Sequence, residues 1–388
     1  MKRALSILGV VTLLLVSIGL IVLASAGGRR AEALGNPSDF FVKRQVVWLC
    51  VALAGMAFAV FWDYHNWRER KWWTVALFGV VLVLLGMVFC FKPINGSHRW
   101  LDLARFGLPM RLQPSELGKL VTVLCVSVWL DRIGRRVGEF LRGALVPCAI
   151  FGVVAALLVA EPDYGSTMVV LSVGFTLMFL AGTKLPQLLA LCCSAVGVVA
   201  TFVAMNPNRM ERIMAWLNGN EHGESDSAAA YQLMQAIIAI TRGGLTGVGY
   251  NRSMQKQFYL PEAHTDFIFA VGAEEFGLAF SLVVLLAFTM IFVCGMYVAL
   301  HARDRLGRLL AFGMTFLVVV QAVVNIGVVT GVLPTKGLAL PLISYGGTNL
   351  MSALFAIGVI INVGLVTMRT ERKNMPHVAR PPSVAAAG

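Results

Sequence analysis

Charged and polar side chains interrupt the long apolar stretches of this sequence at a few places, where they are costly to bury and usually functional. Four short segments hold them, at residues 95–119, 161–167, 259–277 and 333–347. In the third segment, Asp266 enters a strongly apolar stretch, so desolvation should raise its pKa and suit it to act as a general base. His264 lies two residues earlier, placed to tune Asp266 or to relay a proton. Capping of the following helix by Asp266 explains the local sequence equally well.

The first segment carries two opposite charges close to a helix start. Pro114 suits the first turn of a helix, and Glu116 and Lys119 lie three residues apart on one helical face, where they can pair. Charges one turn inside a membrane span should line a cavity and not face lipid. A purely structural ion pair is the alternative interpretation.

The second and fourth segments combine carboxylates with irregular backbone. Glu161 and Asp163 flank a proline at a short turn, where they could bind a cation, although capping of the next helix by Asp163 is the simpler interpretation. Two prolines and three glycines interrupt the apolar stretch at 333–347. Non-helical backbone at membrane depth is tolerated only inside protein or around a watery cavity, so we predict a cavity wall here.

The elements that must position these segments are membrane-spanning helices. The 388 residues are 58% hydrophobic and 13% charged, which excludes an ordinary soluble protein. Stretches long enough to cross a bilayer lie near 4–25, 45–61, 73–91, 117–130, 143–160, 165–182, 186–204, 276–300, 309–332 and 348–367. We therefore predict an all-α polytopic membrane protein of about ten transmembrane helices in a single domain, 1–368. A short basic tail, 369–388, is expected to be disordered.

Basic residues set the expected orientation. The short loops 131–142 and 301–308 carry seven arginines between them, which favours the cytoplasmic side for both loops and both termini. Basic residues in the longer loops opposite are expected to bind an anionic substrate. The net charge of +12 likewise indicates anionic lipid or phosphate partners. Nucleic acid is not expected, because the basic residues are divided among many short loops.

Several other classes of site lack support in the sequence. The seven cysteines and six histidines show no metal-ligand spacing, so no structural zinc site is expected. Glycine motifs for nucleotide phosphates are also missing. The N-terminus imitates a signal peptide, with Lys2-Arg3 before an apolar run and Ala24-Ser25-Ala26 after it. The run has bilayer length, which favours an uncleaved first span.

The longest polar stretch, about 205–266, is the expected extracytoplasmic loop between helices 7 and 8. Within it, 218–227 is rich in Asn, Gly and Ser and is typical of a flexible loop. Residues 228–240 predict an amphipathic or re-entrant helix. The glycine-rich run 243–249 should end that helix.

Taken in order, these segments resemble the SEDS family (shape, elongation, division and sporulation), represented by FtsW and RodA. The matching motifs, between about residues 40 and 368, are R-W, Q-P-S-E-x-x-K, P-D-x-G-[ST], Y-Q, L-P-E-A-H-T-D-F-I-F-A, E-E-x-G and L-P-T-K-G-x-x-L-P-x-I-S-Y-G-G. Residues 261–264 and 334–337 favour the FtsW branch over RodA. The sequence departs from the family pattern at Glu161, where Gln is common, at Thr348-Asn349, where Ser-Ser is usual, and at 209–219, which lacks Asp-Pro.

The resemblance implies a peptidoglycan glycosyltransferase of the inner membrane that polymerises lipid II on the outer face during cell division. It matches Asp266 to the family's essential carboxylate, as general base for the GlcNAc 4-hydroxyl. The candidates to hold pyrophosphate charge are Arg99, Lys119, Arg209, Arg212, Lys256 and Lys336. Further substrate-binding candidates in the matched motifs are Trp100, Glu116, Asp163, Gln232, His264 and Ser344.

The expected partners are lipid II, membrane lipid, a class B penicillin-binding protein that supplies the transpeptidase, and other division proteins. The sequence requires no cofactor, although a divalent cation, Mg²⁺ or Mn²⁺, is a candidate to share the phosphate-binding role. A lipid II flippase, a RodA-type elongation polymerase and a catalytically silent scaffold are the alternative functions. A flippase should carry substrate-binding charge reachable from both faces, whereas the motifs here gather on the outer side.

Overall fold

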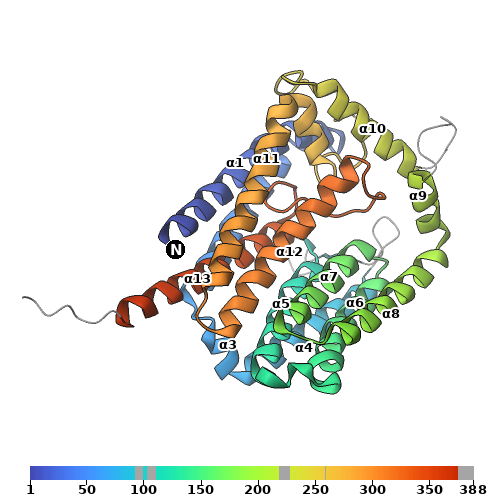
Figure 1. Cartoon of the computed structure of the whole chain (residues 1–388). Coiled ribbons are helices and arrows are strands. Elements are labelled where there is room, and N and C mark those ends of the chain that lie inside the picture. Colours follow the sequence, from blue (N-terminus) through green and yellow to red (C-terminus); the bar gives the residue numbers. More distant parts are fainter. Residues whose placement is uncertain (92–98, 103–110, 218–227, 258, 375–388) are drawn as a thin grey trace, which may run out of the picture.

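The computed structural model describes residues 1–91, 99–102, 111–217, 228–257 and 259–374 of the chain. These residues are almost entirely helical (Figure 1). The long helices are α1 (Lys2–Ala33), α2 (Phe40–Phe61), α4 (Lys71–Met87), α5 (Pro114–Ile133), α6 (Val146–Ala160), α7 (Tyr164–Ala181), α8 (Leu185–Ala204), α11 (Ile268–His301), α12 (Arg305–Val329) and α13 (Gly347–Asn374). The shorter elements are α3 (His65–Glu69), η1 (Val88–Cys90), η3 (Gly134–Gly138), η4 (Phe140–Leu145), α9 (Pro207–Leu217), α10 (Ala228–Gly243) and the antiparallel strands β1 (Leu101–Asp102) and β2 (Arg111–Leu112).

The described part of the chain has nine helices that are long and apolar enough to cross a membrane. α5, with 20 residues, has a similar length but carries Glu116, Lys119 and Asp131, so its composition alone does not mark it as a span. Most of its side chains are buried among neighbouring helices, including those of Glu116 and Lys119. With α5 included, the predicted all-α polytopic fold of about ten spans is confirmed.

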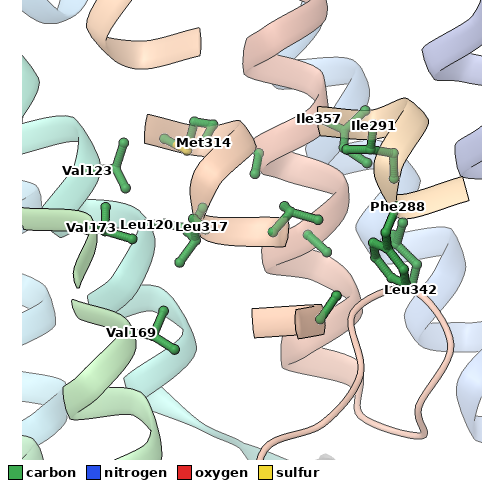
Figure 2. Packing of buried hydrophobic residues seen from close by; sticks show 14 of the residues in the cluster. Leu120, Val123, Val169, Val173, Phe288, Ile291, Met314, Leu317, Leu342 and Ile357 are labelled. Atoms are coloured by element: carbon green, nitrogen blue, oxygen red, sulfur yellow. The ribbon is translucent and has the colours of Figure 1, made fainter. Parts of the chain in front are cut away.

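The core lies where α5, α7, α11, α12 and α13 meet. Figure 2 shows buried side chains in this region, among them Leu120, Val123, Val169, Val173, Phe288, Ile291, Met314, Leu317, Leu342 and Ile357. Lipid tails are as apolar as these side chains, so close packing holds such helices together. At Gly313 on α12, an added Cβ would lie only 2.6 Å from Val123 Cγ1 of α5.

α11 is broken near its start by Gly277, whose φ of 69° and ψ of −156° are not helical. The glycine-rich run 243–249 packs against this break, where the Val248 N–H donates to the Glu274 carbonyl at 3.0 Å. An added Cβ at Gly277 would lie 2.5 Å from Gly247 N, so only glycine fits. The run thereby satisfies backbone groups that a broken helix leaves open.

Of the segment between α8 and α11, α9 lies at the edge of the bundle and α10 lies across one end of it (Figure 1). α8 continues into α9, and α10 packs against α11. α10 confirms the helix predicted at 228–240 and ends at Gly243, where the glycine-rich run begins. The flexible loop predicted at 218–227 lies outside the described residues.

The two terminal helices belong to the bundle. α1 is continuous over its length and packs against α11 and α2. An added Cβ at Gly19 would lie 2.7 Å from Ile343 Cα, so α1 also supports the irregular segment 333–347. α13 packs against α2 and continues to Asn374, past the domain boundary predicted at 368. The rest of the tail, 375–388, lies outside the described residues.

Candidate active site

Asp266, just before α11, lines a cavity of about 180 Å³, called here the Asp266 pocket. Its walls come from residues far apart in the chain, namely Arg99, Trp100, Gln113, Glu116, Glu262, Thr265, Asp266, Gly337, Leu338, Ala339, Tyr345, Gly346, Thr348 and Asn349. Three of the four polar segments noted in the sequence therefore meet around one carboxylate. The predicted cavity wall at 333–347 is confirmed.

A second cavity of about 90 Å³ adjoins the first, because Arg99 and Gly337 line both. We call it the cationic pocket, since Arg99, Arg212 and Lys336 line it together with Asp163. The remaining polar segment, 161–167, enters the site here through Asp163, Tyr164 and Gly165. Two valines of α8, a helix that is mostly exposed and apolar, form another part of the wall. The cationic pocket thus joins positive charge to a lipid-facing helix.

The carboxyl group of Asp266 has the properties of a base at neutral pH. Burial, reinforced by the charge of Glu262, raises the pKa of Asp266 to about 7. Arg99 and Arg212 act in the opposite direction. The residue at the N-cap of α11 is Phe267, and no side chain of the described residues accepts a hydrogen bond from that end, so Asp266 does not serve as the helix cap. A base whose pKa lies near the working pH is efficient in proton abstraction.

Asn325 on α12 holds the backbone around Asp266, a role that the sequence interpretation missed. Its side-chain amide donates to the Asp266 carbonyl at 2.8 Å and to the Leu338 carbonyl at 2.5 Å. One turn earlier on α12, Gln321 donates to the Ala339 carbonyl at 3.1 Å. The signal was present, because two polar residues four apart share one face of an otherwise apolar helix.

Gly337 limits the space beside the base. An added Cβ at this position would lie 2.9 Å from Asp266 Oδ2 and 3.9 Å from Arg99. We expect Gly337→Ala to displace the carboxylate and to lower activity by roughly 10- to 100-fold with little change in stability, because catalysis is sensitive to small misplacements. Initial rates and a thermal unfolding curve check this. Gly9→Ala is a suitable comparison, since an added Cβ there meets nothing within 4 Å and Gly9 lines neither pocket.

The pair predicted between Glu116 and Lys119 is present, with the Lys119 ammonium 2.8 Å from Glu116 Oε1. Lys119 also donates to Gln321 Oε1 at 2.7 Å, and Ser352 donates to the second oxygen of Glu116 at 3.0 Å. Glu116 lines the Asp266 pocket, whereas Lys119 is only 1% exposed and lies behind it. The positive charge of Lys119 is therefore paired with Glu116 and hydrogen-bonded to Gln321 within the protein.

Asp163 acts as the predicted cap of α7, because its Oδ1 accepts the Ser166 N–H at 3.3 Å. The same oxygen lies 4.0 Å from the Arg99 guanidinium, which also donates to the Pro162 carbonyl. The turn that starts α7 thus holds Arg99 at the junction of the two pockets. Asp163 therefore both caps α7 and lines the cationic pocket.

Lys256 and His264 line another cavity, of about 220 Å³, together with Arg30 and Glu262. The Lys256 ammonium is buried and donates to Glu275 Oε1 at 3.0 Å, and it also donates to Ser25 Oγ of α1 and to Asn251 Oδ1 of its own loop. Burial lowers the pKa of His264, whose ring packs 4.8 Å from that of Phe41. Glu262 lines both this cavity and the Asp266 pocket.

The other predicted substrate-binding residues lie at different distances from the base. Trp100 lines the Asp266 pocket. Ser344 is buried and accepts the Leu340 N–H at 2.8 Å, so it shapes the wall from behind. Gln232 lies on α10 and is not among the described residues that line either pocket. Arg209 belongs to α9, but its side chain lies outside the described part of the structure.

The described residues offer few ligands for a metal ion near the two pockets. Within that part of the chain, no three His, Cys, Asp or Glu side chains come together as ligands for a metal ion. An anionic group in the cationic pocket would instead meet the positive charges of Arg99, Arg212 and Lys336. A divalent cation that shares their role stays a prediction.

The chain matches a family of known proteins over most of its length. A family model of cell cycle proteins that covers FtsW, RodA and SpoVE matches residues 5–368. The chain belongs to this family. The resemblance inferred from the ordered motifs is therefore confirmed, and this FtsW/RodA/SpoVE protein is a multi-pass membrane protein.

Among curated relatives, the probable peptidoglycan glycosyltransferase FtsW of Geobacter sp. (strain M18) is 36% identical over 353 residues, covering 90% of this chain and 94% of that protein. The protein of the same name from Coxiella burnetii is 36% identical over 360 residues, covering 92% and 95%. Among solved structures, a chain of a peptidoglycan synthase complex aligns with a TM-score of 0.74 at 27% identity, covering 93% and 97%. RodA of Thermus thermophilus aligns with a TM-score of 0.66 at 26% identity, covering 92% and 95%. The family fold thus extends over almost the whole chain.

Proposed function

We propose that this protein is a peptidoglycan glycosyltransferase that polymerises lipid II into glycan strands. The observation that carries the proposal is Asp266, a carboxyl group with a pKa of about 7 in a pocket that shares Arg99 and Gly337 with a second, cationic pocket. This arrangement offers a base for one hydroxyl group and positive charge for one departing anion. The family relatives that bear the name of this activity support the same conclusion.

In the proposed reaction, the ionised Asp266 carboxylate removes the proton from the GlcNAc 4-hydroxyl of the acceptor. The oxygen then attacks the anomeric carbon of the donor MurNAc, and the bond from that carbon to the pyrophosphate oxygen breaks. Undecaprenyl pyrophosphate leaves with the bonding electrons, and the configuration at the carbon inverts. The protonated Asp266 returns its proton to water before the next addition.

The cationic pocket suits the departing pyrophosphate. Arg99, Arg212 and Lys336 are fixed there before the reaction, so they stabilise developing negative charge without the cost of reorienting solvent. Val199 and Val203 of α8 line the same pocket and provide an apolar wall toward the lipid. A prenyl chain attached to the pyrophosphate would follow this wall into the bilayer.

Removal of one cation from this pocket provides a direct test. We expect Arg212→Ala to lower the polymerisation rate by roughly 10- to 100-fold, because a preorganised charge at a developing anion is lost. Arg252→Ala is the matched control, since Arg252 is exposed and lies outside both pockets. Equal rates for the two variants would remove Arg212 from the mechanism.

The orientation and the biological setting follow from the same proposal. With both termini in the cytoplasm, the Asp266 pocket and the cationic pocket lie toward the outer face of the inner membrane, where lipid II is polymerised. Motifs 261–264 and 334–337 favour the division branch over elongation. A class B penicillin-binding protein is the expected partner for cross-linking, and the similar fold of a chain from a peptidoglycan synthase complex supports this pairing.

The decisive experiment supplies labelled lipid II to the purified protein with its transpeptidase partner. Glycan polymer is expected from the wild type, and none from a folded Asp266→Ala variant. Full polymerisation by that variant would eliminate Asp266 as the base. Movement of lipid II across liposomes without polymer would favour the flippase, and partner recruitment with neither activity would favour the scaffold.

A further inference from the structure

Glu161 is a carboxyl group that the reaction described above leaves unused. It follows α6 directly, is 0% exposed, and finds no hydrogen-bond partner for either carboxylate oxygen among the residues that the structure describes. Buried polar groups in proteins nearly always have partners, and an ionised carboxylate without them is very costly to bury. The environment of Glu161 therefore favours the neutral acid.

Arg99 connects Glu161 with the base. Its guanidinium donates to the carbonyl of Pro162, the residue next to Glu161, and lies 4.0 Å from Asp163 Oδ1. The Arg99 Nε is buried and, within the described part of the chain, has no hydrogen-bond partner, as is the case for both oxygens of Glu161. Arg99 also lines both pockets, and its charge lowers the pKa of Glu161 and that of Asp266 alike. One cation is thus shared between two carboxyl groups.

We propose that Glu161 is a positioning residue for the glycosyl transfer. When Glu161 is a neutral acid, Arg99 stays at the junction of the two pockets, and when Glu161 is a carboxylate, it draws the Arg99 guanidinium out of the junction toward its own oxygens. The inference rests on the proposed function. In the second state, Arg99 would lie between two negative charges, since Asp163 is already beside it. Its contribution to the departing pyrophosphate would then fall.

The charges around Glu161 set the pH at which this change occurs. Burial in the first place, and then the charge of Asp163, raise the pKa of Glu161 to about 8, whereas Arg99 lowers it. Arg212 and Lys336 are the other charged residues that line the cationic pocket, and Glu211 precedes Arg212 on α9. Ionisation of Glu161 is therefore expected just above neutral pH.

The two carboxyl groups impose opposite pH limits. Asp266 must be ionised, so the rate should rise with pH through about 7, and Glu161 must be neutral, so the rate should fall through about 8. Glu161→Gln is neutral at every pH and nearly the same shape. We expect this variant to match the wild type at neutral pH and to lose the alkaline fall, with a rate roughly tenfold above the wild type one pH unit beyond the pKa of Glu161.

The test measures initial polymerisation rates against pH for the wild type, Glu161→Gln and the control Glu139→Gln, whose exposed side chain pairs with Arg142. An infrared titration of the membrane protein provides a second readout, in which a protonated carboxyl band present in the wild type and absent from Glu161→Gln should disappear through about pH 8. If Glu161→Gln does not fold, Glu161→Met replaces it as a neutral side chain of similar length.

The outcomes separate this inference from the proposed function. An unchanged alkaline fall in folded Glu161→Gln, loss of its activity at every pH, or no carboxyl band that Glu161 explains would each overturn the positioning role. A wild type that makes no polymer at any pH would overturn the proposed function instead. In that case the infrared band alone decides whether Glu161 carries the proton.

Discussion

Replacement of Asp266 by asparagine is expected to lower the rate of glycan polymerisation by about 10²- to 10⁴-fold, the usual contribution of a general base. The amide keeps the shape of the carboxyl group, and Asn325 still holds the backbone carbonyl at 2.8 Å. Because burial raises the pKa of Asp266 to about 7, wild-type activity should increase with pH through that value. The residual activity of Asp266→Asn should show no such increase, as rates measured across the pH range will reveal.

Two controls separate chemistry from folding in this experiment. Asp39→Asn alters an exposed carboxylate that pairs with Lys43 and should leave the rate and its pH dependence unchanged. Thermal unfolding of Asp266→Asn should resemble that of the wild type, because a buried carboxyl group with a raised pKa is replaced by a neutral isostere. Near-normal activity in the folded variant, or an unchanged rise with pH, would exclude Asp266 as the base.

Replacement of Lys119 by methionine is expected to destabilise the protein by about 3–5 kcal/mol, because it leaves the carboxylate of Glu116 buried without its cation. Lys119 and Glu116 are 1% and 4% exposed at their side chains and lie 2.8 Å apart. Gln321 loses the donor to its Oε1 as well. Unfolding by heat or denaturant in detergent, measured against the wild type, gives the change in stability.

The double variant Lys119→Met with Glu116→Gln should recover a large part of this loss, since replacing both members of a buried pair costs much less than removing one. Lys43→Met is the exposed counterpart, with side-chain exposures of 72% and 49% for Lys43 and Asp39. It should cost no more than about 1 kcal/mol. Similar losses of stability for Lys119→Met and Lys43→Met would show that the buried pair contributes no more to stability than the exposed pair.

The sequence by itself predicted the spans because the bilayer imposes a simple rule on the chain. Every peptide group in lipid must be satisfied within its own helix, so each crossing leaves an apolar stretch of recognisable length. The same local reasoning placed the pair Glu116–Lys119, since residues three apart share a helical face. It also placed the cap at Asp163 and the helix at 228–240, because both depend on neighbours in sequence.

Local chemistry was less informative where long-range packing decides the role of a residue. A cap and a base were equally good interpretations of Asp266, and the ordered motifs favoured the base only through family resemblance. The structure adds the absence of a cap on α11 and the burial that raises the pKa of Asp266. Lys256 was expected to meet phosphate, yet Glu275 and Ser25, distant in sequence, surround its ammonium.

What the sequence determined, then, is that this is a many-span membrane protein with a small set of polar segments and one outstanding carboxylate. Only the tertiary structure decided that those segments meet, that Arg99 joins two pockets, and that Asn325 supports the base. The physical reason is that helix periodicity records which face is apolar, but not which neighbour that face will meet. Contacts between helices depend on packing over the whole bundle, so the site appears only when the bundle is assembled.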